Sequence, residues 1–283
     1  MDSLAGRVCV VTGASSGIGK ETALGLARRD ADVVLVGRTA NRLTSAEQDV
    51  AAVGRGAVSS HVCEFARLDD VRALAATLLD SCQQIHVLVN NAGQVLQKRQ
   101  ETADGYEATF AVNHLAPYLL TRLLLDRLLA CTPSRVVTVS SDAYRWGLLD
   151  FDDLQTRDTS YKPLKVYGNS KLANALFAWE LARRTAGSGL TSNAVHPGFV
   201  STSLGRDNAI ANVFLRLIRP FVRGPAKGAE TSIHVASSPE GAEHSGEFWV
   251  DCKPIPVGPK AVDPEWALRL WEVSADLVGL PRD

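Results

Sequence analysis

The sequence of 283 residues predicts a doubly wound α/β fold, in which about seven strands form a parallel sheet with helices on both faces. Two observations predict this fold. Short runs of β-branched and other apolar residues alternate along the chain with longer stretches of helical periodicity. The strand-like runs are apolar throughout, which is typical of parallel strands that are covered on both faces.

The expected elements follow one another in a regular order. Strands are expected at 7–11, 33–36, 57–63, 85–89, 135–139, 190–195 and 248–250. Helices are expected at 17–29, 40–53, 68–79, 105–130, 166–186 and, near the C-terminus, about 263–278. Stretches that contain Pro and Gly at 196–205 and 253–264 are expected to be loops. Because no linker-like composition separates these elements, we expect a single domain over 1–283.

Composition argues against several classes of function. The formal net charge of −1 makes nucleic-acid binding a poor default. There is no run of about eighteen uncharged apolar residues and no basic-then-apolar leader, so we expect neither a transmembrane helix nor a signal peptide. The five cysteines are scattered without a CxxC pair, so we expect reduced thiols in a cytoplasmic protein and no metal site.

The first expected strand runs directly into a glycine-rich turn, Thr12-Gly13-Ala14-Ser15-Ser16-Gly17-Ile18-Gly19, which opens the first helix. Glycine permits positive φ angles and lets a phosphate approach the backbone, while free N–H groups and the helix dipole favour an anion. A tight turn without a ligand can have the same composition, but the position at the first strand–helix junction favours a dinucleotide site. The residues predicted to bind it are Gly13, Ser15, Ser16, Gly17, Ile18 and Gly19.

The end of the second expected strand distinguishes two nicotinamide cofactors. An NAD site places a carboxylate there, on the ribose 2′-hydroxyl. In this chain Gly37, Arg38 and Thr39 follow the strand, and no Asp or Glu occurs before Glu47. A guanidinium suits the 2′-phosphate of NADP, so Arg38 is predicted to bind it and NADP(H) is the predicted cofactor. The alternative for Arg38 is a solvated loop charge.

A tyrosine and a lysine four residues apart form a candidate catalytic pair. Reduction of a carbonyl needs a hydride donor, a proton donor and a group that polarises the oxygen. Tyr167 and Lys171 are one helical turn apart, and the ammonium is expected to lower the pKa of the phenol. A second Tyr-x-x-x-Lys, Tyr161 to Lys165, is interrupted by Pro163, which keeps its two ends off one helix face. We therefore choose Tyr167 and Lys171.

These motifs together resemble the short-chain dehydrogenase/reductase family. The glycine spacing Gly-x-x-x-Gly-x-Gly, the segment Asn90-Asn91-Ala92-Gly93 after the fourth strand and the Tyr-x-x-x-Lys pair all match it. Other segments look like the retinol dehydrogenase-like branch, which includes the light-dependent protochlorophyllide reductases: 104–107, 113–115, 150–154, 170–174 and 251–253. The resemblance extends nearly from end to end, and it implies a Rossmann fold and oxidoreductase activity.

The resemblance also implies roles for individual residues. Ser141, at the end of the fifth strand, would hydrogen-bond the substrate oxygen, in preference to Ser140. Asn113 would hold a water that relays protons to Lys171, and Lys171 and Tyr167 would also contact the cofactor. Further cofactor contacts are implied after the third, fourth and sixth strands: Glu64, where the family has Asp, with Phe65, Asn90, Ala92, Gly93, Pro197, Gly198, Val200 and Thr202.

The segment 203–227 is the most individual part of the sequence. Its apolar residues form one helical stripe, and four basic residues lie elsewhere on the helix. It is interpreted as a helix packed on the core or as a mobile lid over an apolar substrate, with a membrane-surface helix as the third alternative.

The sequence predicts an NADP(H)-dependent oxidoreductase that interconverts an apolar aldehyde or ketone and an alcohol, with Tyr167 as acid/base. The alternatives are a non-catalytic NADP(H)-binding sensor or scaffold and a C=C reductase of the protochlorophyllide type. The expected partner is a small molecule, without nucleic acid and without a stable membrane anchor. Because family members often form dimers or tetramers, the resemblance implies a homo-oligomer.

Overall fold

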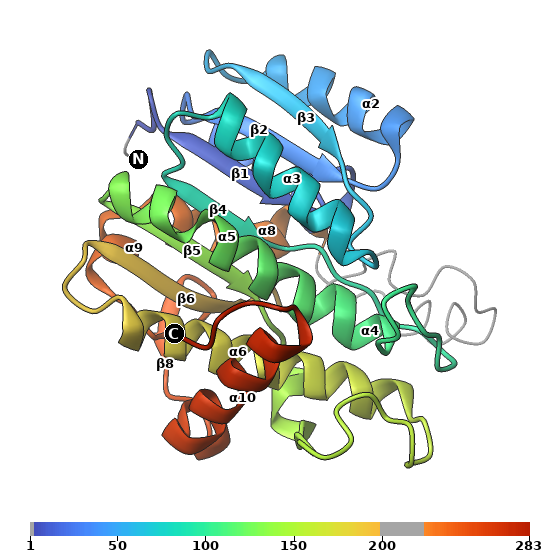
Figure 1. Ribbon diagram of the computed structural model, residues 1–283. Helices are drawn as coiled ribbons and strands as arrows, with labels where there is room; N and C mark the ends of the chain where they lie inside the picture. Colours follow the sequence, from blue (N-terminus) through green and yellow to red (C-terminus); the bar gives the residue numbers. More distant parts are fainter. Residues whose placement is uncertain (1–2, 199–223) are drawn as a thin grey trace.

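A single sheet organises the protein, and the computed structural model describes residues 3–198 and 224–283 around it. The sheet has eight strands in the order β3-β2-β1-β4-β5-β6-β7-β8 (Figure 1). The strands are β1 (Val8–Thr12), β2 (Asp32–Gly37), β3 (Val58–Val62), β4 (Val87–Asn90), β5 (Ser134–Val139), β6 (Leu190–His196), β7 (Phe248–Val250) and β8 (Lys253–Ile255). All neighbouring pairs are parallel except β7 and β8. The predicted doubly wound α/β fold is confirmed.

Helices cover both faces of the sheet. One face packs against α1 (Gly17–Ala27), α2 (Ala40–Ala51) and α8 (Pro225–Ser237), and the other against α3 (Leu68–Ser81), α5 (Ala116–Ala130) and α6 (Pro163–Arg184). Successive residues of a strand pack on opposite faces of the sheet. In β1, Cys9 and Val11 pack on the side of α1, α2 and α8, and Val10 packs on the side of α3, α5 and α6. The central strands β1 and β4 are buried on both faces and are almost continuously apolar, whereas the edge strand β3, Val-Ser-Ser-His-Val, is partly exposed.

The helix expected at 105–130 is divided into three parts. It consists of α4 (Ala108–Phe110), the π-helical turn η1 (Ala111–Leu115) and α5. The buried Glu107 begins it, because its carboxylate accepts hydrogen bonds from the backbone N–H groups of Thr109 and Phe110. π-Turns inside helices frequently occur at functional sites, and this one contains Asn113.

The prediction of a loop at 253–264 was wrong for its first part, because Lys253–Ile255 form β8. Asp251 and Cys252 join β7 to β8 with φ angles of 50° and 60°. Positive φ at both central residues is the type I′ geometry of two-residue hairpins, but the sequence lacks the Asn-Gly or Asp-Gly signal for it. Pro254 is tolerated because β8 is an edge strand. The rest of that loop contains a 3-10 turn, η4 (Pro259–Val262).

In the described part of the chain after β6, one helix was expected and two, α8 and α9, were not predicted. The helix expected at 263–278 is confirmed as α10 (Pro264–Leu277), which packs on α6 (Figure 1). Helices α8 and α9 (Pro239–Glu243) had no counterpart in the sequence prediction. Most of the segment predicted as a lid, 203–223, lies outside the described residues, and α8 begins at Pro225. Among the helices of the described ranges, none has the length and apolar character needed to cross a bilayer.

Candidate active site

The predicted site residues gather at the carboxyl edge of the sheet. The strand order reverses between β1 and β4, because the chain builds β1, β2 and β3 outward on one side and the later strands on the other. Ligands of open α/β sheets bind outside the carboxyl ends of the strands at such a switch point. The glycine-rich turn follows β1 and the Asn90–Gly93 segment follows β4, so the two motifs face each other there.

Hydrogen bonds lock these two motifs together. The Thr12 hydroxyl donates to the carbonyl of Val89 over 3.2 Å and accepts from the N–H groups of Asn91 and Ala92, each over 3.0 Å. The Asn91 amide donates in turn to the Thr12 carbonyl over 2.8 Å. Sequence reasoning missed Thr12 and Asn91 as positioning residues, although both stand inside the quoted motifs. The Thr12 hydroxyl and the Asn91 amide, at the ends of two strands, were the sequence features that could have indicated this role.

The glycines of the turn are required by both conformation and space. Gly13 and Gly17 have φ angles of 67° and 58°. A Cβ on Gly13 would also lie 2.8 Å from the Asn91 amide nitrogen, whereas a Cβ on Gly17 would meet no protein atom within 4 Å. The turn is therefore packed against β4 at Gly13 and open at Gly17.

The N-terminus of α1 fits an anionic group. Its N-cap residue, Ser16, makes no side-chain capping hydrogen bond, and the first turn of the helix has no acidic residue. The free N–H groups and the positive end of the helix dipole therefore lie beside the open Gly17. The neighbouring Ser15 lies against the end of β2, since a Cβ on Gly37 would be 3.3 Å from the Ser15 hydroxyl oxygen. Arg38, which follows Gly37 at the end of β2, is exposed.

Residues after β3 and β4 hold their positions mainly by local bonds. The Glu64 carboxylate accepts from the Ala66 N–H over 3.1 Å, and Phe65 is buried in the core. The Phe65 side chain is therefore not available to a ligand. The Asn90 amide donates to the Thr121 hydroxyl over 2.9 Å, while its carbonyl oxygen is buried without a hydrogen-bond partner in the described structure.

Ser141, Tyr167 and Lys171 converge beyond the end of β5. The Ser141 side chain lies close enough to the Tyr167 hydroxyl to act on its pKa. The Lys171 ammonium lies 5.4 Å from the centroid of the Tyr167 ring and donates to the Val139 carbonyl over 3.0 Å. Ser140 has a different role, because its hydroxyl donates to the Lys171 carbonyl over 2.7 Å and ties β5 to α6.

Burial controls the pKa values of both members of the pair. Burial raises the pKa of Tyr167 to about 12, although the Ser141 side chain acts to lower it. Burial lowers the pKa of Lys171 to about 8. The expected lowering of the tyrosine pKa by the lysine is not seen: loss of solvation of the phenolate is the larger cause of the shift, and the opposing cause is Ser141, not Lys171.

Asn113 joins η1 to the strand ends. Its amide donates to the Gln94 carbonyl over 3.0 Å and to the Ser170 hydroxyl over 2.9 Å, and its oxygen accepts from the Gln94 N–H over 2.7 Å. A Cβ on Gly93 would lie 3.2 Å from the Asn113 oxygen and 3.7 Å from the Lys171 nitrogen. Asn113, Gly93 and Lys171 are therefore neighbours, as the resemblance implied.

The competing tyrosine lies outside this cluster. Pro163 is the first residue of α6, so Tyr161 precedes the helix that carries Lys165. The Tyr161 hydroxyl donates to the Leu96 carbonyl over 3.2 Å and to the Glu107 carboxylate over 3.3 Å. Pro163 therefore keeps Tyr161 off the helix that carries Lys165, as predicted from the sequence.

The loop after β6 is described only in part. Pro197 and Gly198 follow the strand, and Gly198 has a φ of 80°. Val200 and Thr202, which were predicted to bind the cofactor, lie outside the described residues. His196, the last residue of β6, is buried and accepts from the Asp142 N–H over 3.3 Å. His114 is also buried, with its Nε2 atom 2.9 Å from the Ser274 hydroxyl.

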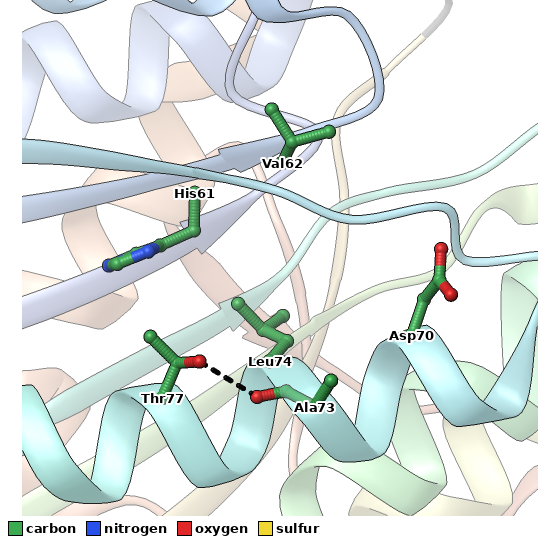
Figure 2. A pocket seen from close by; sticks show the side chains of 6 residues that line it. All are labelled: His61, Val62, Asp70, Ala73, Leu74 and Thr77. Atoms are coloured by element: carbon green, nitrogen blue, oxygen red, sulfur yellow. Dashed lines mark hydrogen bonds between the residues drawn. The ribbon is translucent and has the colours of Figure 1, made fainter.

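A separate pocket lies at the edge of the sheet between β3 and α3. Figure 2 shows its lining side chains, His61, Val62, Asp70, Ala73, Leu74 and Thr77, with Thr77 hydrogen-bonded to the Ala73 carbonyl. None of the predicted site residues lines this pocket. The arrangement at the carboxyl edge, and not this pocket, brings the chemical groups together.

Comparison with known proteins agrees with this geometry. The family model for short chain dehydrogenases matches residues 7–211. Retinol dehydrogenase 12 from Bos taurus is 43% identical over 279 residues, which cover 98% of this chain and 88% of the relative.

Two crystal structures extend the comparison. One, of an uncharacterized protein from Mycobacterium paratuberculosis, has 33% identity and a TM-score of 0.82, covering 100% of this chain and 97% of that one. The other, a short chain dehydrogenase from Burkholderia cenocepacia in complex with NADP, has 27% identity and a TM-score of 0.69, covering 87% and 96%. The chain is therefore an oxidoreductase of the short-chain dehydrogenase/reductase family and belongs to its retinol dehydrogenase-like branch.

Proposed function

We propose that the protein is an NADP(H)-dependent enzyme that interconverts an apolar aldehyde or ketone and an alcohol, with Tyr167 as acid/base. The observation that carries the proposal is the convergence of the Ser141 side chain and the Lys171 ammonium on Tyr167, with the ammonium 5.4 Å from the centroid of the tyrosine ring. Two hydroxyls at one site can both hydrogen-bond one substrate oxygen. Such a site is suited to a carbonyl oxygen that gains negative charge.

The protein groups would act on that oxygen in reduction, while NADPH supplies the hydride. Ser141 holds and polarises the oxygen, and Tyr167 donates its proton to it. A pKa of about 12 keeps Tyr167 protonated at neutral pH, so it is in the donor form, and an alkoxide is basic enough to take the proton. Asn113 and Lys171 would support return of a proton to the tyrosine. The same pKa disfavours alcohol oxidation near pH 7, because that direction needs the phenolate.

The residues of the turn fit a dinucleotide. The uncapped start of α1 and the open side of Gly17 would receive the pyrophosphate. The exposed Arg38 at the end of β2 would pair with the 2′-phosphate, in place of the carboxylate that an NAD site needs. The NADP complex of the Burkholderia relative supports this preference.

Exposed apolar side chains beside the site support an apolar substrate. Trp146 and Leu148 are 65% and 49% exposed at the end of η2 (Asp142–Trp146), the 3-10 turn that begins after Ser141. Leu164 is 65% exposed in the first turn of α6, one turn before Tyr167. The retinol dehydrogenase relatives also support an apolar alcohol or aldehyde.

The proposal is tested by the decay of NADPH absorbance, with NADH in parallel, against a panel of aldehydes and ketones that includes retinal. NADPH consumption with apolar carbonyls, well above that with NADH, is the expected result. Binding of NADPH without turnover across the panel would contradict the proposal and favour the non-catalytic sensor. Activity that requires light would favour the C=C reductase.

A further inference from the structure

Two glycines bring the backbones of η2 and α6 into direct contact next to Tyr167. A Cβ on Gly168 would lie 2.8 Å from the carbonyl oxygen of Ala143, and a Cβ on Gly147 would lie 2.7 Å from that of Gly168. Both overlaps are with backbone atoms, which cannot move aside by rotating about a side-chain bond. Any residue larger than glycine at either position must therefore separate the two elements.

Backbone conformation does not explain either glycine. Gly147 has a φ of −65°, and Gly168 lies inside α6, so alanine could adopt both conformations. Inside a helix, glycine is less favourable than alanine by about 1 kcal/mol. Gly168 thus weakens the helix that carries Tyr167. Its structural role is to let η2 approach α6 closely.

The contact fixes the position of Ser141 through a short chain of hydrogen bonds. The Ser141 carbonyl accepts from the Tyr144 N–H over 2.9 Å, and the Tyr144 carbonyl accepts from the Gly147 N–H over 2.9 Å. Beyond Gly147, the Leu148 N–H donates to the Asn169 side chain of α6 over 2.9 Å. Ser141, as the N-cap of η2, therefore moves with the turn as one unit.

We propose that Gly147 and Gly168 are positioning residues, which set the Ser141 hydroxyl against the Tyr167 hydroxyl by letting η2 lie directly on α6. The inference rests on the proposed function, because it assigns the glycines to the geometry of that proton donor. Neither glycine touches the substrate in this account. Both act through the distance between two hydroxyls.

The test is the Gly168→Ala variant, with Ser141→Ala and the double variant for comparison. Gly168→Ala is expected to lower kcat by about tenfold or more while the Kd for NADPH changes by less than about threefold. The acid limb of alcohol oxidation should also move to higher pH, because Ser141, which acts to lower the pKa of the phenol, is moved away from it. In the Ser141→Ala background the same glycine change should alter kcat by less than about twofold, since the two changes remove one interaction.

A matched control separates positioning from stability. Gly241 lies in α9, remote from the site. A Cβ at this position would also overlap a backbone atom, the carbonyl oxygen of Val235. Gly241→Ala should lower the melting temperature and leave the pH limb unmoved. An equal shift of the limb in both glycine variants, or full additivity of Gly168→Ala with Ser141→Ala, would overturn the proposal.

A second variant covers the case in which Gly168→Ala does not fold. Asn169→Ala removes the hydrogen bond to Leu148 without adding atoms, so it should produce a smaller shift of the limb in the same direction. An unmoved limb in a folded Asn169→Ala protein would overturn the proposal. If Tyr167→Phe retains activity, the proposed function itself fails; if Tyr167→Phe is inactive but the Gly168 and Asn169 variants are normal, only this inference fails.

Discussion

The ammonium group of Lys171 donates a hydrogen bond to the carbonyl oxygen of Val139, over 3.0 Å, at the last residue of β5. The lysine is thereby held between the strand that leads to Ser141 and the helix that carries Tyr167. It is almost fully buried, with 4% of its surface exposed, and burial lowers its pKa to about 8. Its charge is therefore sensitive to pH in a range where an ordinary lysine stays charged.

This pKa predicts an alkaline limb in carbonyl reduction. The ammonium is present below about pH 8 and is lost as the pH rises through that value, so kcat/KM for NADPH, which reports the free enzyme, should fall above about pH 8. Lys171→Met should lower kcat/KM and abolish the limb. A profile that is flat to pH 10, or a limb that persists in Lys171→Met, would rule out this role for the lysine charge.

Arg38 is predicted to determine cofactor preference. Arg38→Ala should raise the KM for NADPH by about tenfold or more and leave the KM for NADH nearly unchanged, because a charge-assisted contact to the 2′-phosphate contributes about 1.5–3 kcal/mol. Arg42→Ala, an exposed arginine one turn further on, is the matched control and should affect neither cofactor. Equal effects of Arg38→Ala on NADPH and NADH would show that Arg38 does not contact the phosphate.

The buried His114 is predicted to make stability depend on pH. Burial lowers its pKa from 6.5 to about 4, so the unfolded chain binds a proton between these values that the folded protein does not. This contribution to stability is complete above pH 6.5 and is lost as the pH falls toward 4. Between pH 7.5 and 5 it amounts to about 2 kcal/mol. Urea unfolding at several pH values gives the free energy of unfolding of the wild type and of His114→Gln. The contribution of His114 is the difference between the two in how this free energy changes with pH.

The half-buried His61 on β3 offers the control for this measurement. His61→Gln should retain the pH dependence of the wild type, and His114→Gln should lose about 2 kcal/mol of it. If His114→Gln and the wild type lose equal stability on acidification, the burial of a neutral histidine is not the cause.

Features that depend on neighbouring residues could be predicted from the sequence. Pro163 at the start of α6 separated Tyr161 from Tyr167, because the effect of proline on a helix is local. Central strands such as β1 and β4 were recognisable because burial on both faces leaves an almost continuous apolar run. The glycine-rich turn and the Asn90–Gly93 segment were placed correctly at the ends of the first and fourth strands, since each follows an apolar run directly.

Features that depend on distant contacts could not be predicted in the same way. The direction of the Tyr167 pKa was missed, because desolvation depends on how α6 packs and not on the lysine four residues away. The π-turn around Asn113 is stabilised by Gln94 and Ser170, which come from other elements. In the β7–β8 hairpin, both Asp251 and Cys252 have positive φ angles. A cysteine at the second position does not predict this turn, whereas a glycine would. The contact between Gly147 and Gly168 joins residues that only the fold brings together.

The most direct test of the central claim is the turnover of Tyr167→Phe with a carbonyl substrate found in the NADPH assay. The exchange removes only the hydroxyl, so NADPH should bind with nearly unchanged affinity while kcat falls by about two orders of magnitude or more. This result would support Tyr167 as the proton donor. Turnover within about threefold of the wild type would contradict the account, because the proton would then come from another group.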